Sequence, residues 1–244
     1  MLASIIITSY NYEKYIEECI NSCLSQKKVN DFEVIIIDDG STDNTQAIIK
    51  KYTSNPKVRM YINKNQGIEY SSNFGINRAL GKYILRVDAD DVIHDDFLFR
   101  TLEAIDKQKV AFVYSNYSTI NEHSESIKEV TLPTFSKEEL LVRGDFLATG
   151  TLYERKALED IGLYNEKTKN CGLENYEVIL KLLNKAYLGY HLNETLFLYR
   201  RHNNNMSEIK RNSIISYGRG LFKNLKLGQY QTNKNHPYGL IVND

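Results

Sequence analysis

Two mostly apolar runs in this chain each end in a group of aspartates, and this pairing limits the folds that the chain can adopt. Val34–Ile37 are four consecutive β-branched residues, and Asp38-Asp39 follow them directly. Tyr83–Val87 leads in the same way into Asp88-Ala89-Asp90-Asp91. Such runs predict strands that are buried on both faces, as in parallel sheets. Because parallel strands end at one edge of a sheet, the two acidic groups are expected to lie together there.

Strands and helices are predicted to alternate through the first half of the chain. The expected strands are Ala3–Thr8, Phe32–Asp38, Val58–Ile62, Tyr83–Val87 and Val110–Tyr114. The expected helices between them are Tyr12–Gln26, Thr45–Tyr52, Ser71–Leu80 and Asp95–Lys107. This alternation predicts an α/β fold with a Rossmann-like, doubly wound, mostly parallel sheet flanked by helices. With 244 residues the chain is long enough for one large domain.

The second acidic group has the chemistry of a metal site. An Asp-x-Asp at the carboxyl end of a buried strand offers hard oxygen ligands that suit Mg²⁺ or Mn²⁺ carrying a diphosphate. Three carboxylates within four residues repel one another unless a cation or solvent neutralises them. A solvated loop or a helix N-cap is the alternative interpretation. A calcium loop is excluded by spacing, because Ile93 stands where such a loop needs glycine.

Together with the segment Thr8-Ser9-Tyr10-Asn11, the two acidic motifs resemble those of family-2 glycosyltransferases of the GT-A fold. The resemblance covers roughly residues 3–205. It implies a metal-dependent, inverting enzyme that moves a sugar from a nucleotide diphosphate donor, with a UDP-sugar the first choice. The implied acceptor is a saccharide or a lipid-linked saccharide, the cofactor is Mn²⁺ or Mg²⁺, and the implied process is bacterial surface polysaccharide assembly.

The resemblance also implies roles for residues at the ends of the predicted strands. Asp39 would accept a hydrogen bond from the uracil imide, Asp88 would bind the ribose hydroxyls and Asp90 would ligate the metal, with Asp91 supporting the loop. The remaining residues that match donor-binding positions of the family are Thr8, Tyr10, Gly67 and Asn73. Ser72 stands where the family commonly has arginine, so one cation is missing, and Lys64 or Arg86 could replace it.

The general base departs from the family pattern. The family normally supplies Glu-Asp at a helix start, with the aspartate as the base, whereas this chain has Glu174-Asn175. An amide has no basic site of useful pKa, so Glu174 or Glu177 is expected to take the proton, and Glu174 is the first choice. Two alternatives stay open: Glu174 only charges the first turn of its helix, or the protein is a non-catalytic donor-binding or scaffold homologue.

A second polar segment follows two predicted short strands, Leu188–Leu192 and Leu196–Tyr199. Tyr199-Arg200-Arg201-His202 resembles the Tyr-Arg-x-His segment of the family, which closes over the metal and the diphosphate. By this resemblance Arg200 would pair with the diphosphate, and His202 would complete the coordination of the metal.

The chain is expected to consist of a GT-A domain at 1–205 and a C-terminal helical extension at 206–244. Within the domain, 1–116 would bind the nucleotide and 117–205 would form the acceptor half. The extension carries an apolar stripe made of Ile214, Tyr217, Leu221, Phe222 and Leu225. Such a helix could pack on the domain, pair two copies as a homodimer, or make peripheral contact with an anionic membrane.

Composition excludes several other classes. The 31 basic and 31 acidic side chains give zero net charge, so a nucleic-acid partner is not expected. The apolar runs fall short of the ~20 residues of a membrane span, and three cysteines fit a reduced compartment. A cytoplasmic protein is therefore predicted, with the inner face of the membrane as an alternative location. A sugar nucleotidyltransferase would be expected to have a basic Gly-rich loop after the first strand, where this chain has Thr8-Ser9-Tyr10-Asn11.

Overall fold

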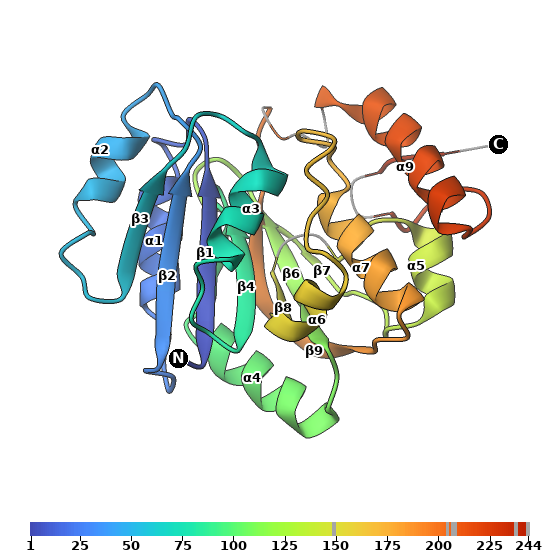
Figure 1. Cartoon of the computed structure of the whole chain (residues 1–244), viewed down its shortest axis with the longest axis horizontal. Coiled ribbons are helices and arrows are strands. Elements are labelled where there is room, and N and C mark those ends of the chain that lie inside the picture. Colours follow the sequence, from blue (N-terminus) through green and yellow to red (C-terminus); the bar gives the residue numbers. More distant parts are fainter. Residues whose placement is uncertain (148–149, 204, 206–208, 237–238, 243–244) are drawn as a thin grey trace.

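A mixed β-sheet with helices on both faces forms the body of the protein in the computed structural model (Figure 1). The structure describes residues 1–147, 150–203, 205, 209–236 and 239–242. Its strands are β1 (Ala3–Ser9), β2 (Phe32–Asp38), β3 (Val58–Ile62), β4 (Tyr83–Asp88), β5 (Val92–Ile93), β6 (Phe112–Ile120), β7 (Ser126–Val130), β8 (Thr151–Glu154) and β9 (Gly189–Arg200). Its helices are α1 (Ile16–Leu24), α2 (Thr45–Lys50), α3 (Ile68–Ile76), α4 (Phe97–Gln108), α5 (Lys137–Arg143), α6 (Arg155–Asp160), α7 (Glu174–Asn184) and α9 (Arg211–Leu225).

The first half of the chain forms the predicted doubly wound parallel sheet. Strands β3, β2, β1 and β4 lie in that order and are all parallel, with α1 behind them and α3 in front in Figure 1. The apolar runs of β1 and β2 are fully buried between these helices. Ser9 lies beside Asp38, and Thr8 lies beside Asp88, in the register of neighbouring strands. The two acidic motifs therefore meet at one edge of the sheet, as the sequence predicted.

The second half of the sheet is mixed, so the expectation of a mostly parallel sheet holds only for the first four strands. Strand β8 runs antiparallel to both β4 and β6, whereas β6 and β9 are parallel. The two predicted short strands at 188–192 and 196–199 are one strand, β9. Its register against β6 shifts at Asn116, which pairs with Thr195 although its neighbour Ser115 pairs with Leu192. A bulge at Asn193-Glu194 therefore keeps these polar residues within a continuous strand.

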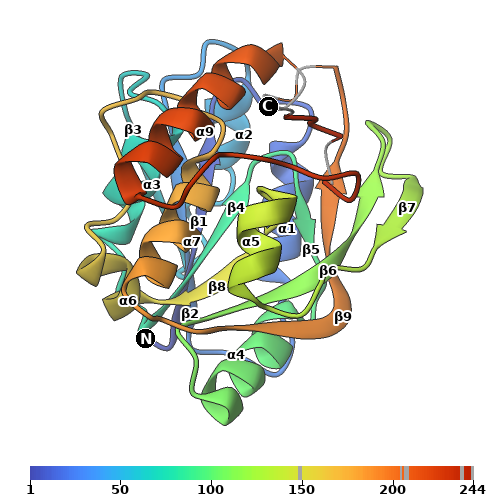
Figure 2. The same cartoon turned by 90° about the vertical axis from the view of Figure 1, so that its right-hand side faces the viewer.

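The C-terminal extension packs on the domain. Helix α9 lies against α7, as Figure 2 shows, and buries Ile214, Leu221 and Phe222. The ring of Phe222 lies 6.1 Å from that of Tyr176 on α7. The apolar stripe that suggested a dimer or a membrane contact is thus largely covered by the same chain, which favours the domain-packing alternative. Within the described ranges, no helix has the length and apolar composition needed to cross a bilayer.

His236, which follows α9, is a buried histidine that holds the end of the chain. Its side chain is only 6% exposed and lies against Gly144, and its Nδ1 accepts a hydrogen bond of 3.4 Å from the backbone N–H of Leu240. Burial lowers the pKa of His236 to about 4, and the positive charge of Arg211 adds to this effect. The folded state therefore holds the imidazole neutral at pH values where an unfolded chain would protonate it.

This burial predicts a loss of stability in acid. The unfolded chain, with a histidine pKa of about 6.5, binds more protons than the folded chain between pH ~6.5 and ~4, so the free energy of unfolding falls as the pH falls through that window, by about 2–3 kcal/mol at most. His236→Gln is expected to reduce the drop in melting temperature between about pH 7 and about pH 4.5. Exposed His123→Gln is the control and should keep the wild-type drop. An unchanged drop in His236→Gln would contradict this account.

Candidate active site

A small cavity lies at the carboxyl ends of β1 and β2, and these ends reach the top edge of the sheet in Figure 1. The cavity has a volume of about 180 Å³, and its walls include Thr8, Tyr10 and Asp39, three of the predicted donor contacts. Asn65 and Asn170 close it from two loops that lie far apart in the sequence. The structure therefore brings these three predicted residues together around one space.

Asp39 is held in place by the loop that leads into α3. Its carboxylate accepts hydrogen bonds from the backbone N–H groups of Gln66, at 2.8 Å, and Gly67, at 2.7 Å. Gly67 has a φ of 100°, and a Cβ at this position would lie 2.5 Å from the side chain of Lys169. Glycine is thus required here both by backbone conformation and by space. The predicted residues Asp39 and Gly67 form one rigid unit at the wall of the cavity.

Asn73 has a different role from the predicted direct contact with the donor. Its amide nitrogen donates to the carbonyl of Tyr164, at 2.9 Å, and to the carboxylate of Glu166, at 2.6 Å. Its amide oxygen accepts from the backbone N–H of Tyr164 at 3.0 Å. Because these bonds use the buried amide, Asn73 ties α3 to the loop after α6 and supports the site through that loop.

Asp90 and His202, the two predicted metal ligands, lie next to each other. His202 Nε2 is 3.0 Å from Asp90 Oδ2, although the two residues are 112 positions apart. The imidazole ring stacks on Tyr15 of the segment before α1, with 5.3 Å between ring centroids. This stacking orients the histidine toward the acidic loop. A carboxylate oxygen and an imidazole nitrogen are thereby placed where one ion could contact both.

Asp88 is a further acidic residue beside Asp90, and its environment fits a bound cation. Its Oδ1 is buried and accepts no hydrogen bond from the described residues, although Arg86 Nη2 lies 3.3 Å away. Burial raises the pKa of Asp88 well above its ordinary value, and the negative charges of Asp90 and Glu174 raise it further, while Arg86 opposes them. A divalent ion would relieve this repulsion, and hard oxygens with one imidazole suit Mn²⁺ or Mg²⁺.

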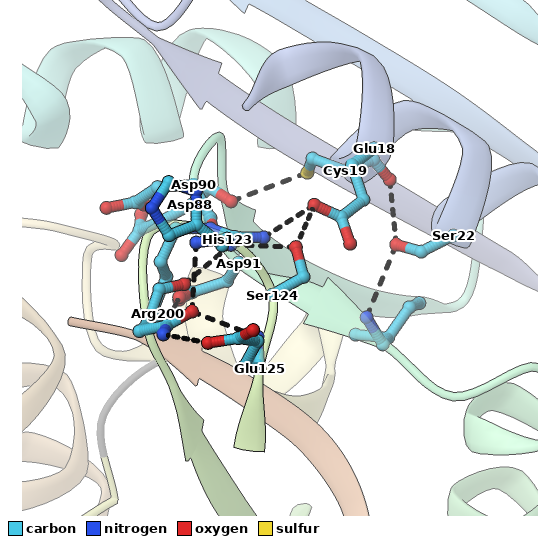
Figure 3. A network of polar contacts seen from close by, with 12 residues as sticks. Glu18, Cys19, Ser22, Asp88, Asp90, Asp91, His123, Ser124, Glu125 and Arg200 are labelled. Carbon is cyan, nitrogen blue, oxygen red and sulfur yellow. Dashed lines mark hydrogen bonds and ion pairs between the residues drawn. The ribbon is translucent and has the colours of Figure 1, made fainter. Parts of the chain in front are cut away.

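Arg200 is buried under the metal motif instead of facing a diphosphate, which corrects the sequence-based prediction (Figure 3). Its side chain is fully buried, and its Nε donates to the backbone carbonyl of Asp90 at 2.7 Å. Nη2 donates to Glu18 on α1 at 2.6 Å, and Nη1 donates to Ser124 in the turn after β6 at 3.0 Å. The backbone N–H of Arg200 donates to Asp91 Oδ1 at 2.9 Å. Arg200 is therefore a positioning residue for the acidic loop.

The two candidate bases point to different places. Glu174, at the start of α7, lies at the acidic site, where its Oε1 is 3.2 Å from Arg86 Nη2, the same nitrogen that contacts Asp88. Glu177 is 4% exposed and faces α9, where it accepts a hydrogen bond from Tyr217 and pairs with Lys181 at 2.9 Å. Of the two glutamates, only Glu174 is brought to the predicted donor-binding edge.

Arg86 links the candidate base to the metal motif, and the sequence had suggested it only as a substitute cation. Its guanidinium is buried, and its Nε and Nη1 donate no hydrogen bond to any described residue. Burial alone would lower its pKa, but the charges of Asp88 and Glu174 hold the pKa above its ordinary value. Asn175, at the position of the family's base, is buried and accepts a hydrogen bond from the Tyr164 hydroxyl at 3.2 Å.

Comparison with known proteins identifies the family. The model of "Glycosyl transferase family 2" matches residues 4–162. The chain belongs to glycosyl transferase family 2. Among curated members, it is 34% identical to chondroitin synthase of Pasteurella multocida over 212 residues, which are 84% of this chain and 21% of the synthase. It is 30% identical to the putative teichuronic acid biosynthesis glycosyltransferase TuaG of Bacillus subtilis, over 86% of this chain and 82% of TuaG.

Solved structures confirm the GT-A fold of this family member. S. aureus TarS in complex with UDP-GlcNAc superimposes with a TM-score of 0.77 at 21% identity, over 94% of this chain and 67% of TarS. The mannosyltransferase PcManGT of Pyrobaculum calidifontis, in complex with GDP-Man and Mn²⁺, gives a TM-score of 0.69 at 15% identity, over 97% of this chain and 67% of that one. At these identities the likeness establishes the fold alone. The chain spans about a fifth of the length of the Pasteurella synthase.

The position of Arg200 predicts that the acidic loop depends on it. Arg200→Gln is expected to lower the free energy of unfolding by about 3 kcal/mol, because its partners are left unpaired. Arg200→Lys keeps the charge but cannot bridge Asp90, Glu18 and Ser124 at once. This variant should still fold, but its affinity for Mn²⁺ should be lower than that of the wild type. Chemical denaturation and Mn²⁺ titration measure the two effects, with exposed Arg219→Gln as the control. Wild-type Mn²⁺ affinity in folded Arg200→Lys would refute the positioning role.

Proposed function

We propose that this chain is a metal-dependent, inverting glycosyltransferase that uses a nucleotide diphosphate sugar, with a UDP-sugar as the first choice. The observation that carries the proposal is the meeting of Asp88, Asp90 and Glu174 at the edge of the sheet that also holds the cavity beside Asp39. The complexes of TarS with UDP-GlcNAc and of PcManGT with GDP-Man and Mn²⁺ support a donor of this class.

The donor would lie across the ends of β1, β2 and β4. The cavity formed by Thr8, Tyr10 and Asp39 would take the base, with a carboxylate oxygen of Asp39 as acceptor for the imide N–H. Asp90 and His202, with Asp88 beside them, would hold Mn²⁺ or Mg²⁺. When bound, the ion supplies positive charge that stabilises the diphosphate leaving group.

Glu174 is proposed as the general base. In an inverting displacement, the acceptor hydroxyl oxygen forms a bond to the anomeric carbon while the bond from that carbon to the diphosphate breaks. The hydroxyl proton passes to a carboxylate on the side opposite to the diphosphate. Arg86 pairs with Glu174 and so orients the carboxylate. Asn175 cannot take this role, and its amide instead holds the hydroxyl of Tyr164.

The acceptor is proposed to be a growing saccharide, free or lipid-linked, in the assembly of a bacterial surface polysaccharide. The names of the chondroitin synthase and of TuaG, which both concern polysaccharides, support this class of product. The cytoplasm, or the inner face of the membrane for a lipid-linked acceptor, is the proposed place of the reaction.

The assignment of the base predicts unequal effects of two similar substitutions. Glu174→Gln is expected to lower the rate of donor hydrolysis or sugar transfer by about 10²-fold or more, because the amide accepts no proton. Glu177→Gln should keep the rate within a few-fold and lower the melting temperature, because its partners Tyr217 and Lys181 belong to the contact with α9. Release of UDP from a panel of UDP-sugars, measured with Mn²⁺, gives the rates.

The reverse pattern would move the role of base to Glu177. If wild-type protein binds UDP but releases none from any donor, the chain is instead a donor-binding or scaffold homologue. Asn175 is the feature that favours this second function, because the family's usual base is missing at that position.

The metal site predicts metal-dependent nucleotide binding. Calorimetric titration with UDP is expected to show saturable binding in the presence of Mn²⁺, and Asp90→Asn should weaken it at least about tenfold, because one ligand charge is lost. GDP and dTDP, titrated in parallel, identify the base. Equal UDP affinity with and without Mn²⁺ would contradict a metal role for the acidic loop.

A further inference from the structure

A second, larger cavity lies between the loop 165–171 and helix α9. Its volume is about 930 Å³, which is within the range of about 300–1,000 Å³ of small-molecule sites. The loop stands between α3 and α9 in Figure 1, at the same edge of the sheet as the acidic motifs. Asn170 belongs to the walls of both this cavity and the smaller cavity beside Asp39. The two spaces are therefore neighbours across one residue.

The walls of the larger cavity carry an excess of positive charge. Lys167, Lys169 and Lys210 all line it, and none of the three forms an ion pair with a carboxylate of the described residues. Lys169 Nζ donates to two uncharged oxygens of Asn65, and Lys210 Nζ donates to the backbone carbonyl of Asn170 at 3.1 Å. The walls thus hold three lysines, and although the ammonium of Lys169 is directed at Asn65 in the wall of the smaller cavity, their positive charge favours an anionic ligand.

The carboxylate in the same walls does not cancel this charge. Glu177 is buried, pairs with Lys181 at 2.9 Å and accepts a hydrogen bond from Tyr217, so its charge is already compensated. Helix α9 has Lys210 as its N-cap residue and no acidic residue in its first turn, so the positive end of its dipole adds to the lysines.

The remaining walls suit a saccharide and are held in place. Tyr217 offers an aromatic ring, and Asn212, Ser213 and Ser216 offer amide and hydroxyl groups of the kind that bind sugar hydroxyls. The loop is fixed by its backbone, since the N–H groups of Asn170 and Cys171 donate to Glu69 at 2.8 Å each, and by Asn165, whose side chain donates to Tyr217. Such a preformed wall needs little ordering on binding.

The wall of the cavity at Cys171 lies close to the candidate base, although Glu174 itself is not part of the wall. Cys171 lines the cavity, and its Sγ and the carboxylate oxygens of Glu69 and Glu174 lie within 4.8 Å of one another. We propose that this cavity binds an anionic part of the acceptor chain, a uronate or a phosphodiester, and so delivers the acceptor end to Glu174. The proposal rests on the proposed glycosyltransferase function and adds the chemical class of its acceptor.

The test is a calorimetric titration of the purified chain with three probes of similar length. These are hyaluronan hexasaccharide with carboxylates, a glycerol phosphate hexamer with phosphodiesters, and uncharged chitohexaose. At least one charged probe should bind, more weakly as salt is raised, and at least about tenfold more tightly than chitohexaose. The preferred probe then distinguishes a uronate from a phosphodiester. Binding of no charged probe, or equal binding of chitohexaose, overturns the proposal.

Two charge reversals place the binding site. The backbone N–H of Lys167 donates to Asn165 at 3.2 Å, but its ammonium group donates to no described residue, so Lys167→Glu should leave the fold intact and weaken binding of the charged probe about tenfold or more. Lys223→Glu changes the same charge on an exposed part of α9 outside the cavity and should bind as the wild type does. Equal weakening by both variants overturns the proposed site.

A parallel titration of each variant with UDP and Mn²⁺ separates the two proposals. Wild-type UDP affinity together with loss of the charged probe in Lys167→Glu supports the cavity as an acceptor site. UDP binding without binding of any charged probe refutes the anionic acceptor and leaves the proposed donor site standing. Binding of a charged probe in a chain that binds no nucleotide refutes the transferase function, and with it the acceptor role of the cavity.

Discussion

The acidic loop at Asp88–Asp91 depends on a buried guanidinium that the second half of the chain supplies. Arg200, at the end of β9, donates to the backbone of Asp90, to Glu18 on α1 and to the turn after β6. A buried arginine needs such partners because its charge has lost its hydration, and only its planar fork can reach three directions at once. The acidic loop is therefore held both by the backbone carbonyl of Asp90 and by the carboxylate of Asp91, while the carboxylate of Asp90 lies beside His202. The first half of the chain would lack this support without β9.

Buried polar side chains of the first half of the chain hold the loops on the other side of the site, also through hydrogen bonds to the backbone. Asp39 holds the loop at Gly67, Glu69 holds the backbone at Asn170, and Asn73 holds the backbone at Tyr164. Each uses a side-chain oxygen to accept hydrogen bonds from backbone N–H groups that no strand or helix satisfies. The wall shared by the two cavities is thus built from loops that α3 and β2 anchor.

The sequence predicted the parts of the fold that local patterns determine. Four consecutive β-branched residues identified β2, and the aspartates after β2 and β4 had to meet because parallel strands end together. The hydrogen-bond and ion-pair partners of the charged side chains could not be predicted, because these partners are residues distant in the chain. Arg200 looked like a phosphate ligand, yet its partners lie on α1 and in the turn after β6. Glu174 was only the first choice over Glu177, three residues away, and it is their distant partners that separate them: Arg86 pairs with Glu174, whereas Tyr217 of α9 donates to Glu177. The bulge in β9 likewise appeared as a break between two strands.

The amide at position 175 is consistent with the charge balance of the site. Asp88 and Glu174 already share one buried arginine, Arg86, and burial, together with the negative charges of Asp90 and Glu174, raises the pKa of Asp88. A carboxylate at Asn175 would add a fourth negative charge beside Glu174 and would raise the pKa values of its neighbours further. Asn175 instead binds the hydroxyl of Tyr164, whose ring lies 5.6 Å from the guanidinium of Arg86. The amide thus supports the packing around Arg86 and leaves that cation to pair with Glu174, the proposed base.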